Sequence, residues 1–280
     1  MKLTWILAAT FLAAAFCNAQ QQLRMEPAHE SGQSVSPAFE GWFANPDGSF
    51  SILFGYFNRN MQQELDIPIG VENKMEPGGM DQGQPTHFMT RRQWGIFTVT
   101  VPKDFVGKKL TWTISANGVT TAIPASLDAL WELAPFKDAS GDTPPFVGFK
   151  PEGPFVQGPK GHTMNLTATV GSPLALPLFV ADDASLIPGA ARPRTPPVML
   201  TWTKYRGPGK VTFSKEKPEV AEAEFTAPAK TTMHGKAETS VTFSQTGEYV
   251  LHVAANDWTG EGGRGFQCCW TNAQVKVRVQ

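Results

Sequence analysis

The chain of 280 residues carries 24 Lys and Arg against 25 Asp and Glu, which gives a formal net charge of −1. This balance, with no long basic run, provides no electrostatic surface for nucleic acid or an anionic membrane, and we expect neither as a partner. The 26 glycines and 23 prolines are more typical of short strands joined by tight turns than of a helical protein.

The first 19 residues have the features of a secretory signal peptide. Lys2 supplies a positive charge, Leu3 to Phe16 form a short apolar run, and small residues precede a predicted cleavage after Ala19. A lipoprotein anchor at Cys17 is the weaker alternative, because bulky Phe16 stands where a small residue is expected. No later run of about 18 apolar residues follows, so we expect a secreted or periplasmic protein without membrane insertion.

Residues 37–125 are predicted to form an antiparallel β-sandwich, preceded by a flexible polar leader at 20–36. Positions 45–48 read Asn-Pro-Asp-Gly, a turn sequence, and apolar side chains alternate with others over 50–56. Asn117-Gly118 lies between two alternating stretches and is a strong hairpin signal. No known family is identified for this half of the chain.

A Gly-, Pro- and Met-rich excursion at 71–93 interrupts these strands. The excursion is long for a loop without structure, so it is either functional or ordered against the sheet. The sequence leaves open whether His87 joins Arg91 and Arg92 in a site on it.

Residues 126–162 are predicted to connect two domains, since prolines and glycines are frequent there. The stretch from Ser126 to Leu133 is predicted to form a short helix. Ser126 is its expected N-cap, and Leu127, Leu130 and Trp131 would share one face.

Residues 163–280 are predicted to form a second β-sandwich from short alternating strands. A Trp-bearing strand precedes a Gly-Pro-Gly turn and a Val-x-Phe stretch, and a Phe-x-x-x-Gly-x-Tyr pattern and an Asp-containing turn come later. This pattern resembles the PKD-type immunoglobulin-like domain, which implies the fold and says little about function. The chain departs from that family by a glycine-rich insertion after the last matching residue. The matching residues are Trp202, Gly207, Pro208, Gly209, Val211, Phe213, Phe243, Gly247, Tyr249 and Asp257.

Catalytic signatures are missing from the sequence: it has no nucleophile elbow, no His-Glu-x-x-His zinc motif and no phosphate-binding loop. The histidines are scattered, without a second ligand at metal spacing. His252 alternates with Leu251 and Val253, so its side chain is predicted to point outward. We expect no catalysis by the protein itself and no cofactor.

Asp182, Asp183 and Asp257 lie at predicted strand ends and are weak candidates for a Ca²⁺ site, since Ca²⁺ prefers carboxylate oxygens. No Asp-x-Asp-x-Asp run accompanies them. Capping of turns by these side chains is therefore the favoured interpretation, and no metal site is predicted outright.

The glycine-rich insertion is the predicted ligand-binding region. Loops at the end of a sandwich commonly carry binding residues, and flat aromatic rings stack on sugars. The candidates are Trp258, Arg264, Phe266 and Trp270.

Cys268 and Cys269 are adjacent, and three interpretations remain open for them. A vicinal disulfide is narrowly favoured, because lone thiols seldom stay reduced in an oxidising compartment. Alternatively, strand parity with Val275 and Val277 would bury Cys269 and expose Cys268. The third interpretation is an intermolecular bridge through Cys268.

We therefore expect a non-enzymatic protein with a binding or structural role at the cell surface or in the periplasm, and a glycan or a protein as its partner. The alternatives are a secreted hydrolase with a site between the two domains and an accessory subunit of an extracytoplasmic complex. A hydrolase predicts that three or more polar side chains converge in an inter-domain cleft, and such a convergence would count against the non-enzymatic interpretation.

Overall fold

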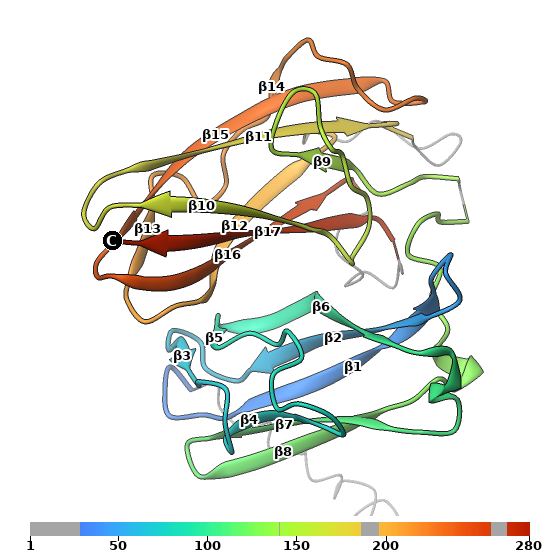
Figure 1. Cartoon of the computed structure of the whole chain (residues 1–280), viewed down its shortest axis with the longest axis vertical. Helices are drawn as coiled ribbons and strands as arrows, with labels where there is room; N and C mark the ends of the chain where they lie inside the picture. The colour runs from blue at the N-terminus through green and yellow to red at the C-terminus, as the bar shows by residue number, and fades with distance from the viewer. Residues whose placement is uncertain (1–28, 140, 186–195, 259–267) are drawn as a thin grey trace, which may run out of the picture.

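A computed structural model describes residues 29–139, 141–185, 196–258 and 268–280, and these residues form two β domains (Figure 1). Helix within the described residues is limited to two single 3-10 turns, η1 (Lys103–Phe105) and η2 (Ala129–Trp131). The predicted all-β fold with two sandwich domains is confirmed. No helix in this part of the chain is long and apolar enough to cross a membrane.

The first domain packs two three-stranded sheets face to face, with strand orders β1-β2-β6 and β4-β7-β8. Alternating side chains fill the core between them, and Trp112, Phe54 and Phe97 form a contiguous aromatic cluster. A small ladder of β3 and β5 lies beside them. The strands are β1 (Val35–Ala44), β2 (Phe50–Asn58), β3 (Leu65–Asp66), β4 (Asn73–Glu76), β5 (His87–Phe88), β6 (Arg91–Val101), β7 (Leu110–Ala116) and β8 (Val119–Ala125).

Both predicted turns of this domain are present. Gly48 donates its N–H to Asn45 O at 2.9 Å, closing the turn between β1 and β2. Asn117 and Gly118 join β7 to β8 with φ angles of 48° and 78°. Positive φ at both central residues is the geometry of a type I′ hairpin, which explains the Asn-Gly pair.

The excursion at 71–93 is ordered against the sheet, as one of its two interpretations predicts. Its β4 pairs with β7, and Asn73 Nδ2 donates to the carbonyl oxygens of Ile67 and Pro85. Trp112 Nε1 donates in turn to Asn73 Oδ1 at 3.0 Å. A fully buried amide therefore anchors the excursion and presents β5 at its far end.

The predicted leader becomes ordered earlier than expected. Gln33 N donates to Asn60 Oδ1 at 2.7 Å, and Asn60 Nδ2 returns a bond to Gln33 O at 2.8 Å. Strand β1 begins at Val35. Residues 29–36 thus belong to the first domain, whereas the predicted signal peptide and residues 20–28 lie outside the described residues.

The short helix predicted after the first domain is a single 3-10 turn. Its cap is Asp128, whose side chain accepts from Leu130 N, rather than Ser126. The chain cannot continue as a helix because Leu133 N bonds to Trp42 O and draws the backbone alongside β1. Leu130 is left 91% exposed, so the predicted apolar face does not form.

The second domain has the strand arrangement of an immunoglobulin sandwich. One sheet has the order β10-β17-β16-β12 and the other β13-β15-β11-β9, with β14 beside β15. The predicted connector supplies β9 to this domain, and β10 pairs with β17 in parallel, unlike the other strand pairs. The strands are β9 (Phe146–Gly148), β10 (His162–Ala168), β11 (Leu174–Asp182), β12 (Met199–Arg206), β13 (Val211–Phe213), β14 (Ala221–Glu222), β15 (Met233–Phe243), β16 (Gly247–Asn256) and β17 (Trp270–Val279).

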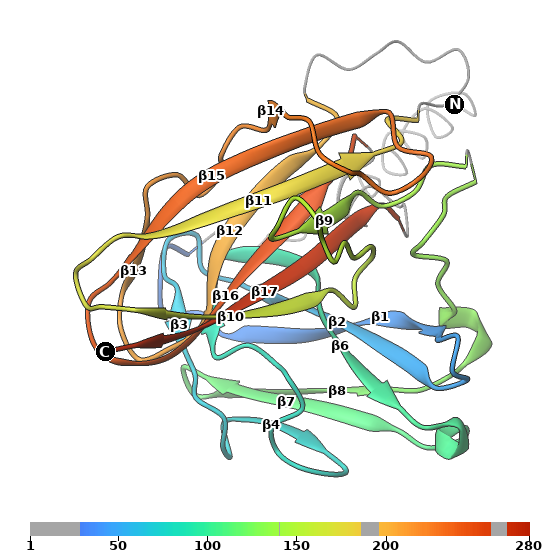
Figure 2. The same ribbon diagram turned by 45° about the horizontal axis from the view of Figure 1, so that its top comes forward.

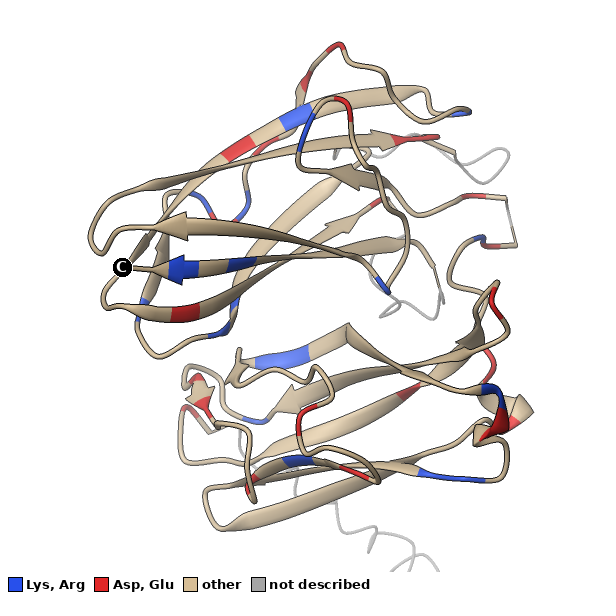
Figure 3. Cartoon of the chain, viewed as in Figure 1, with Lys and Arg blue, Asp and Glu red and all other residues tan. Residues whose placement is uncertain are grey.

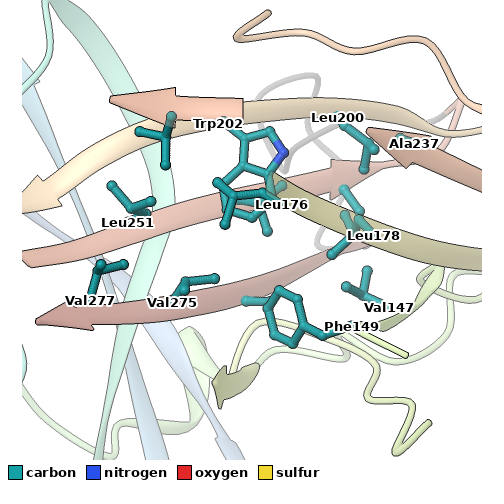
Figure 4. Close-up of a cluster of buried hydrophobic side chains, with 14 of the residues drawn as sticks. Val147, Phe149, Leu176, Leu178, Leu200, Trp202, Ala237, Leu251, Val275 and Val277 are labelled. Atoms are coloured by element: carbon teal, nitrogen blue, oxygen red, sulfur yellow. The ribbon is translucent and has the colours of Figure 1, made fainter. Parts of the chain in front are cut away.

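Trp202 is buried in the second core, which also contains Leu176, Leu200 and Leu251 (Figure 4). Tyr249, at the start of β16, donates its hydroxyl to Gln245 O at 2.9 Å. A tyrosine bonded back to the preceding corner is a recurrent feature of immunoglobulin sandwiches. Gly207 has φ +140°, and a Cβ there would lie 2.1 Å from the Tyr249 ring, so this position requires glycine.

The two domains lie against each other (Figure 1 and Figure 2), and β12 of the second domain contacts β5 of the first. Tyr205 belongs to β12, yet its side chain is buried in the hydrophobic cluster of the first domain. Its hydroxyl donates to Gly83 O, and its carbonyl accepts from Thr86 N at 3.1 Å. Arg206 binds both carboxylate oxygens of Asp81, at 2.9 and 2.8 Å. These contacts hold the domains in one orientation and fix the walls of the cleft between them.

Candidate functional site

A cavity of about 550 Å³ lies between the two domains. The first domain contributes residues of β3 and β5, and the second contributes β12, the Gly-Pro-Gly turn and β13. This volume falls within the usual range of small-molecule sites, about 300–1,000 Å³. The lining residues are Glu64, Asp66, His87, Met89, Trp202, Thr203, Lys204, Pro208, Gly209, Lys210, Val211, Phe213 and Glu216.

His87 is the centre of an ionic network on the first-domain wall. Its Nδ1 lies 2.9 Å from Asp66 Oδ1, and its Nε2 lies 3.1 Å from Glu64 Oε2. Strands β3 and β5 position these groups, because Asp66 pairs directly with His87 in the ladder. From the second domain, Lys204 Nζ donates to the same Asp66 oxygen at 3.0 Å. The network therefore crosses the domain interface.

The network stabilises the charged forms of His87, Glu64 and Asp66. Burial alone would lower the pKa of His87, but the hydrogen bonds to Asp66 and Glu64 outweigh it and raise that pKa. The bond from His87 lowers the pKa of Glu64. Burial opposes ionisation of Asp66, yet the bonds from His87 and Lys204 leave its pKa lowered as well. An imidazolium bonded at both nitrogens has no lone pair with which to accept a proton.

The remaining wall of the cavity mixes polar and apolar groups. Lys210 and Glu216 are exposed, whereas Met89, Val211 and Phe213 are half-buried and present apolar surface. With His87 protonated, three acidic and three basic side chains line the cavity. This local balance matches the chain as a whole, in which basic and acidic residues are interspersed over both domains (Figure 3).

The excursion at 71–93 does reach this site, through His87, but the two arginines predicted as companions do not line it. Arg92 binds Glu40 at 2.9 Å and stacks over Trp94 at 3.8 Å. Arg91 lies over the Phe57 ring at 5.4 Å. Sequence reasoning missed Glu64, Asp66 and Lys204, because no local pattern marks residues that a domain interface brings together.

A second cluster of polar groups lies where β11 and β16 end, in opposite sheets of the second domain. One carboxylate oxygen of Asp142, one of Asp257 and the Sγ of Cys269 lie within 4.8 Å of one another. Asp142, Asp182 and Asp257 are 2%, 1% and 2% exposed. Asp182 and Asp257 are predicted as weak Ca²⁺ candidates. Asp142 comes from the connector, where no sequence pattern indicated a site.

Burial, followed by the charges of neighbouring carboxylates, raises the pKa values of these carboxyl groups. Burial, a hydrogen bond with Asp257 and the nearby negative charges raise the pKa of Asp142 to about 9. Burial and the charges of Asp183 and Asp257 raise the pKa of Asp182 to about 7. Asp183 is only half-buried and accepts from Thr143 Oγ1 and Ser185 N, both at 2.8 Å. Capping by Asp183 and by Asp182, which accepts from Ala184 N, agrees with the turn-capping prediction.

Cys268 and Cys269 are joined by a disulfide, as the favoured interpretation predicts. The parity prediction that Cys268 is exposed is wrong, because the two residues are 1% and 0% exposed. The connector covers the face of the chain at Cys268 that alternation assigns to solvent. Thr271 Oγ1 donates a hydrogen bond to Pro145 O of the connector. The two sulfur atoms lie 3.9 and 3.5 Å from Asp142 O, so the disulfide forms one wall of the carboxylate cluster.

The ligand candidates of the glycine-rich insertion do not form an exposed platform among the described residues. Trp270 is only 3% exposed and packs at the domain interface, where a Cβ on Gly95 would lie 2.4 Å from its ring. Trp258 is half-buried. Arg264 and Phe266 lie outside the described residues. A binding prediction based on an exposed Trp270 is therefore wrong.

The prediction that His252 points outward is also wrong. Its side chain is 3% exposed, and its Nε2 lies 3.1 Å from Asn272 Oδ1. Asn272 Nδ2 donates to Gly95 O at 2.7 Å, which ties β17 to β6. Burial lowers the pKa of His252 to about 4, so this imidazole is neutral and donates to Asn272. The first domain covers a face that alternation alone assigns to solvent.

Comparison with known proteins supplies no family. No family model matches the chain, and no curated protein matches it. Domains 4 and 5 of the S-layer protein SbsC are 10% identical, with 88% of this chain and 98% of that chain covered and a TM-score of 0.25. The D00-D0 domain of intimin is 11% identical, with 87% and 99% covered and a TM-score of 0.25. A family 123 glycoside hydrolase from Clostridium perfringens is 12% identical, with 42% and 23% covered and a TM-score of 0.24. Such slight likeness carries no functional argument.

Proposed function

We propose that this chain is an extracytoplasmic binding protein whose ligand lies in the cavity between its two domains. The observation that carries the proposal is the ionic network of Glu64, Asp66, His87 and Lys204, which lines a cavity of about 550 Å³ with groups from both domains. Polar groups that converge in a preformed concave site are the default signature of ligand binding.

The proposed ligand is neutral and rich in hydroxyl groups, as a glycan segment is. Equal numbers of acidic and basic side chains give the cavity no preference for a charged ligand. Carboxylates such as Glu64 and Glu216 accept hydrogen bonds from hydroxyl groups, and Lys210 donates to them. Phe213 and Met89 offer apolar surface to the C–H face of a sugar ring. A PKD-type second domain, as the sequence resemblance implies, is compatible with this role.

A hydrolase is the second candidate. Four polar side chains converge between the domains, which is the outcome expected for a hydrolase and counts against a non-enzymatic protein. The protonation states oppose a hydrolase. A glycosidase needs one carboxylic acid with a raised pKa beside an ionised one, whereas Glu64 and Asp66 both have lowered pKa values. His87 is bonded to a carboxylate at each ring nitrogen, so it is not available as a general base.

An array of neutral and acidic glycans tests the proposal. Wild-type protein is expected to retain neutral glycans, and Lys210→Gln and Glu216→Gln to lose most of that binding while keeping their melting temperatures, because both side chains are exposed. Asp104→Asn, which alters an exposed ion pair with Lys108 in the first domain, is the matched control and should bind like wild type. Turnover of any retained glycan would support the hydrolase instead, and equal binding by all variants would exclude the cavity.

A further inference from the structure

The carboxyl groups of Asp142, Asp182 and Asp257 all lie in the interior of the second domain, each 2% exposed or less. One oxygen of Asp142 and one of Asp257 lie within 4.8 Å of each other, and Asp182 is a neighbour of Asp257. Ionised carboxylates in a dry interior require a compensating positive charge or a proton. The groups come from three different segments: Asp182 ends β11, Asp257 follows β16, and Asp142 precedes β9. Their convergence therefore depends on the tertiary fold and is not a property of one acidic loop.

Asp182 supplies an independent observation in favour of a cation site. Its Oδ2 accepts from Ala184 N at 2.8 Å, whereas its buried Oδ1 has no hydrogen-bond donor among the described residues. The negative charges that act on this carboxylate include those of Asp257 and Asp183, so Asp182 lies on the Asp257 side of the pair formed by Asp142 and Asp257. A buried carboxylate oxygen without a donor is costly, and a cation would satisfy it.

We propose that Asp142, Asp182 and Asp257 bind a divalent cation of the hard class, Ca²⁺ in particular, between the two sheets of the second domain. Ca²⁺ takes oxygen ligands at about 2.3–2.6 Å, so two ligand oxygens on one ion lie at most about 5 Å apart. The oxygens of Asp142 and Asp257 meet that limit, since they lie within 4.8 Å of each other. One divalent ion also offsets most of the charge of three carboxylates.

The neighbouring Cys269 does not change this choice of metal. Its Sγ lies within the same 4.8 Å, but a disulfide sulfur carries no thiolate and is a poor ligand. A reduced pair of cysteines would instead favour a soft ion such as Zn²⁺. Because the pair is oxidised, only oxygen ligands are available at this site. The disulfide packs beside it, with Sγ of Cys269 3.5 Å from Asp142 O.

The site would join the ends of β11 and β16 and the connector before β9. The two sheets of a sandwich are otherwise held by side-chain packing, so an ion at this end would fasten the segments that flank it. This proposal is independent of the inter-domain cavity, because none of the three carboxylates lines that cavity.

The test uses the purified protein after treatment with EDTA and desalting, titrated with CaCl₂ by calorimetry and followed by its melting temperature. We expect one equivalent of Ca²⁺ to bind and to raise the melting temperature. Asp142→Asn and Asp182→Asn should each weaken Ca²⁺ binding by at least about tenfold, since even changes outside the ligand shell commonly cost that much. Asp104→Asn should bind Ca²⁺ like wild type.

The order of the melting temperatures of wild type and the Asn variants should reverse between EDTA and Ca²⁺, which distinguishes Ca²⁺ binding by these carboxylates from a merely structural role. With EDTA present, the two Asn variants should melt at or above the wild-type temperature, because repulsion between carboxylates is relieved. With Ca²⁺ present, they should melt below wild type. Four results would overturn the proposal: no heat and no stabilisation by millimolar Ca²⁺, a response to Mg²⁺ alone, Zn²⁺ binding that requires a reductant, or an unchanged Ca²⁺ response in both variants.

Discussion

Lys204 of the second domain and Asp66 of the first are joined across the cavity wall, with 3.0 Å between Nζ and Oδ1. The same Asp66 oxygen lies 2.9 Å from Nδ1 of His87. One carboxylate thus couples a histidine of the first domain to a lysine of the second. The orientation of the domains and the shape of the proposed binding site therefore depend on the same few charges.

His87 should make stability depend on pH. Its pKa is raised above the ordinary value of 6.5, so its contribution is fully present below about pH 6.5 and is lost as the pH rises through the folded-state pKa. We expect the free-energy difference between wild type and His87→Gln to shrink from pH 6 to pH 9, measured by urea unfolding at each pH. A difference that grows with pH would contradict the network.

Tyr205 belongs to the second domain but is buried in the core of the first, so it should contribute to the stability of both domains. Tyr205→Ala is expected to cost about 3–5 kcal/mol, as the loss of a large buried aromatic side chain does. Tyr205→Phe keeps the ring and loses the bond to Gly83 O, and should cost about 1 kcal/mol. Chemical denaturation measures both, and Tyr205→Ala should separate one transition into two. Unaltered stability in the Ala variant would mean that the domains do not dock through Tyr205.

The disulfide predicts that neither Cys268 nor Cys269 reacts with a thiol reagent before reduction. After denaturation without reductant, iodoacetamide should leave the peptide containing both residues unmodified. After reduction, the same peptide should carry two adducts. Mass spectrometry of that peptide distinguishes the two states, and two adducts without reductant would refute the disulfide.

The buried carboxylates should destabilise the protein at high pH when metal is absent. The pKa of Asp142 is raised to about 9 and that of Asp182 to about 7, so both groups favour the fold while protonated. That contribution is lost as the pH rises through these values. In EDTA, the melting temperature should therefore fall between about pH 5 and pH 9, and less steeply in Asp182→Asn. A rise over this range would contradict the clustered geometry.

Much of the fold follows from local pattern. Alternation over 50–56 gives β2, and Asn117-Gly118 gives the hairpin of β7 and β8, because both signals depend on neighbours in the sequence. Trp202, which belongs to the Trp-bearing strand of the PKD-type pattern, is only 1% exposed. Alternation and turn residues were therefore sufficient to predict strands and hairpins, whose formation depends on neighbours in the sequence.

The two candidate sites could not be predicted from local sequence, because they depend on contacts between residues that are far apart in the chain. Alternation fails at Cys268 and His252 because the connector and the first domain cover faces that a lone sandwich would expose. Asp142 joins the carboxylate cluster because β9 pairs with β11, and nothing around residue 142 indicates that pairing. Lys204 meets Asp66 across 138 positions of chain.

Hydrogen–deuterium exchange with a neutral oligosaccharide selected on the array tests the central claim most directly. The account predicts that the ligand slows exchange in two separate regions at once, residues 64–89 of the first domain and residues 203–216 of the second. Both line the cavity, and neither alone forms it. Protection confined to one domain, or protection centred on β7 and β8 far from the interface, would contradict a binding site between the two domains.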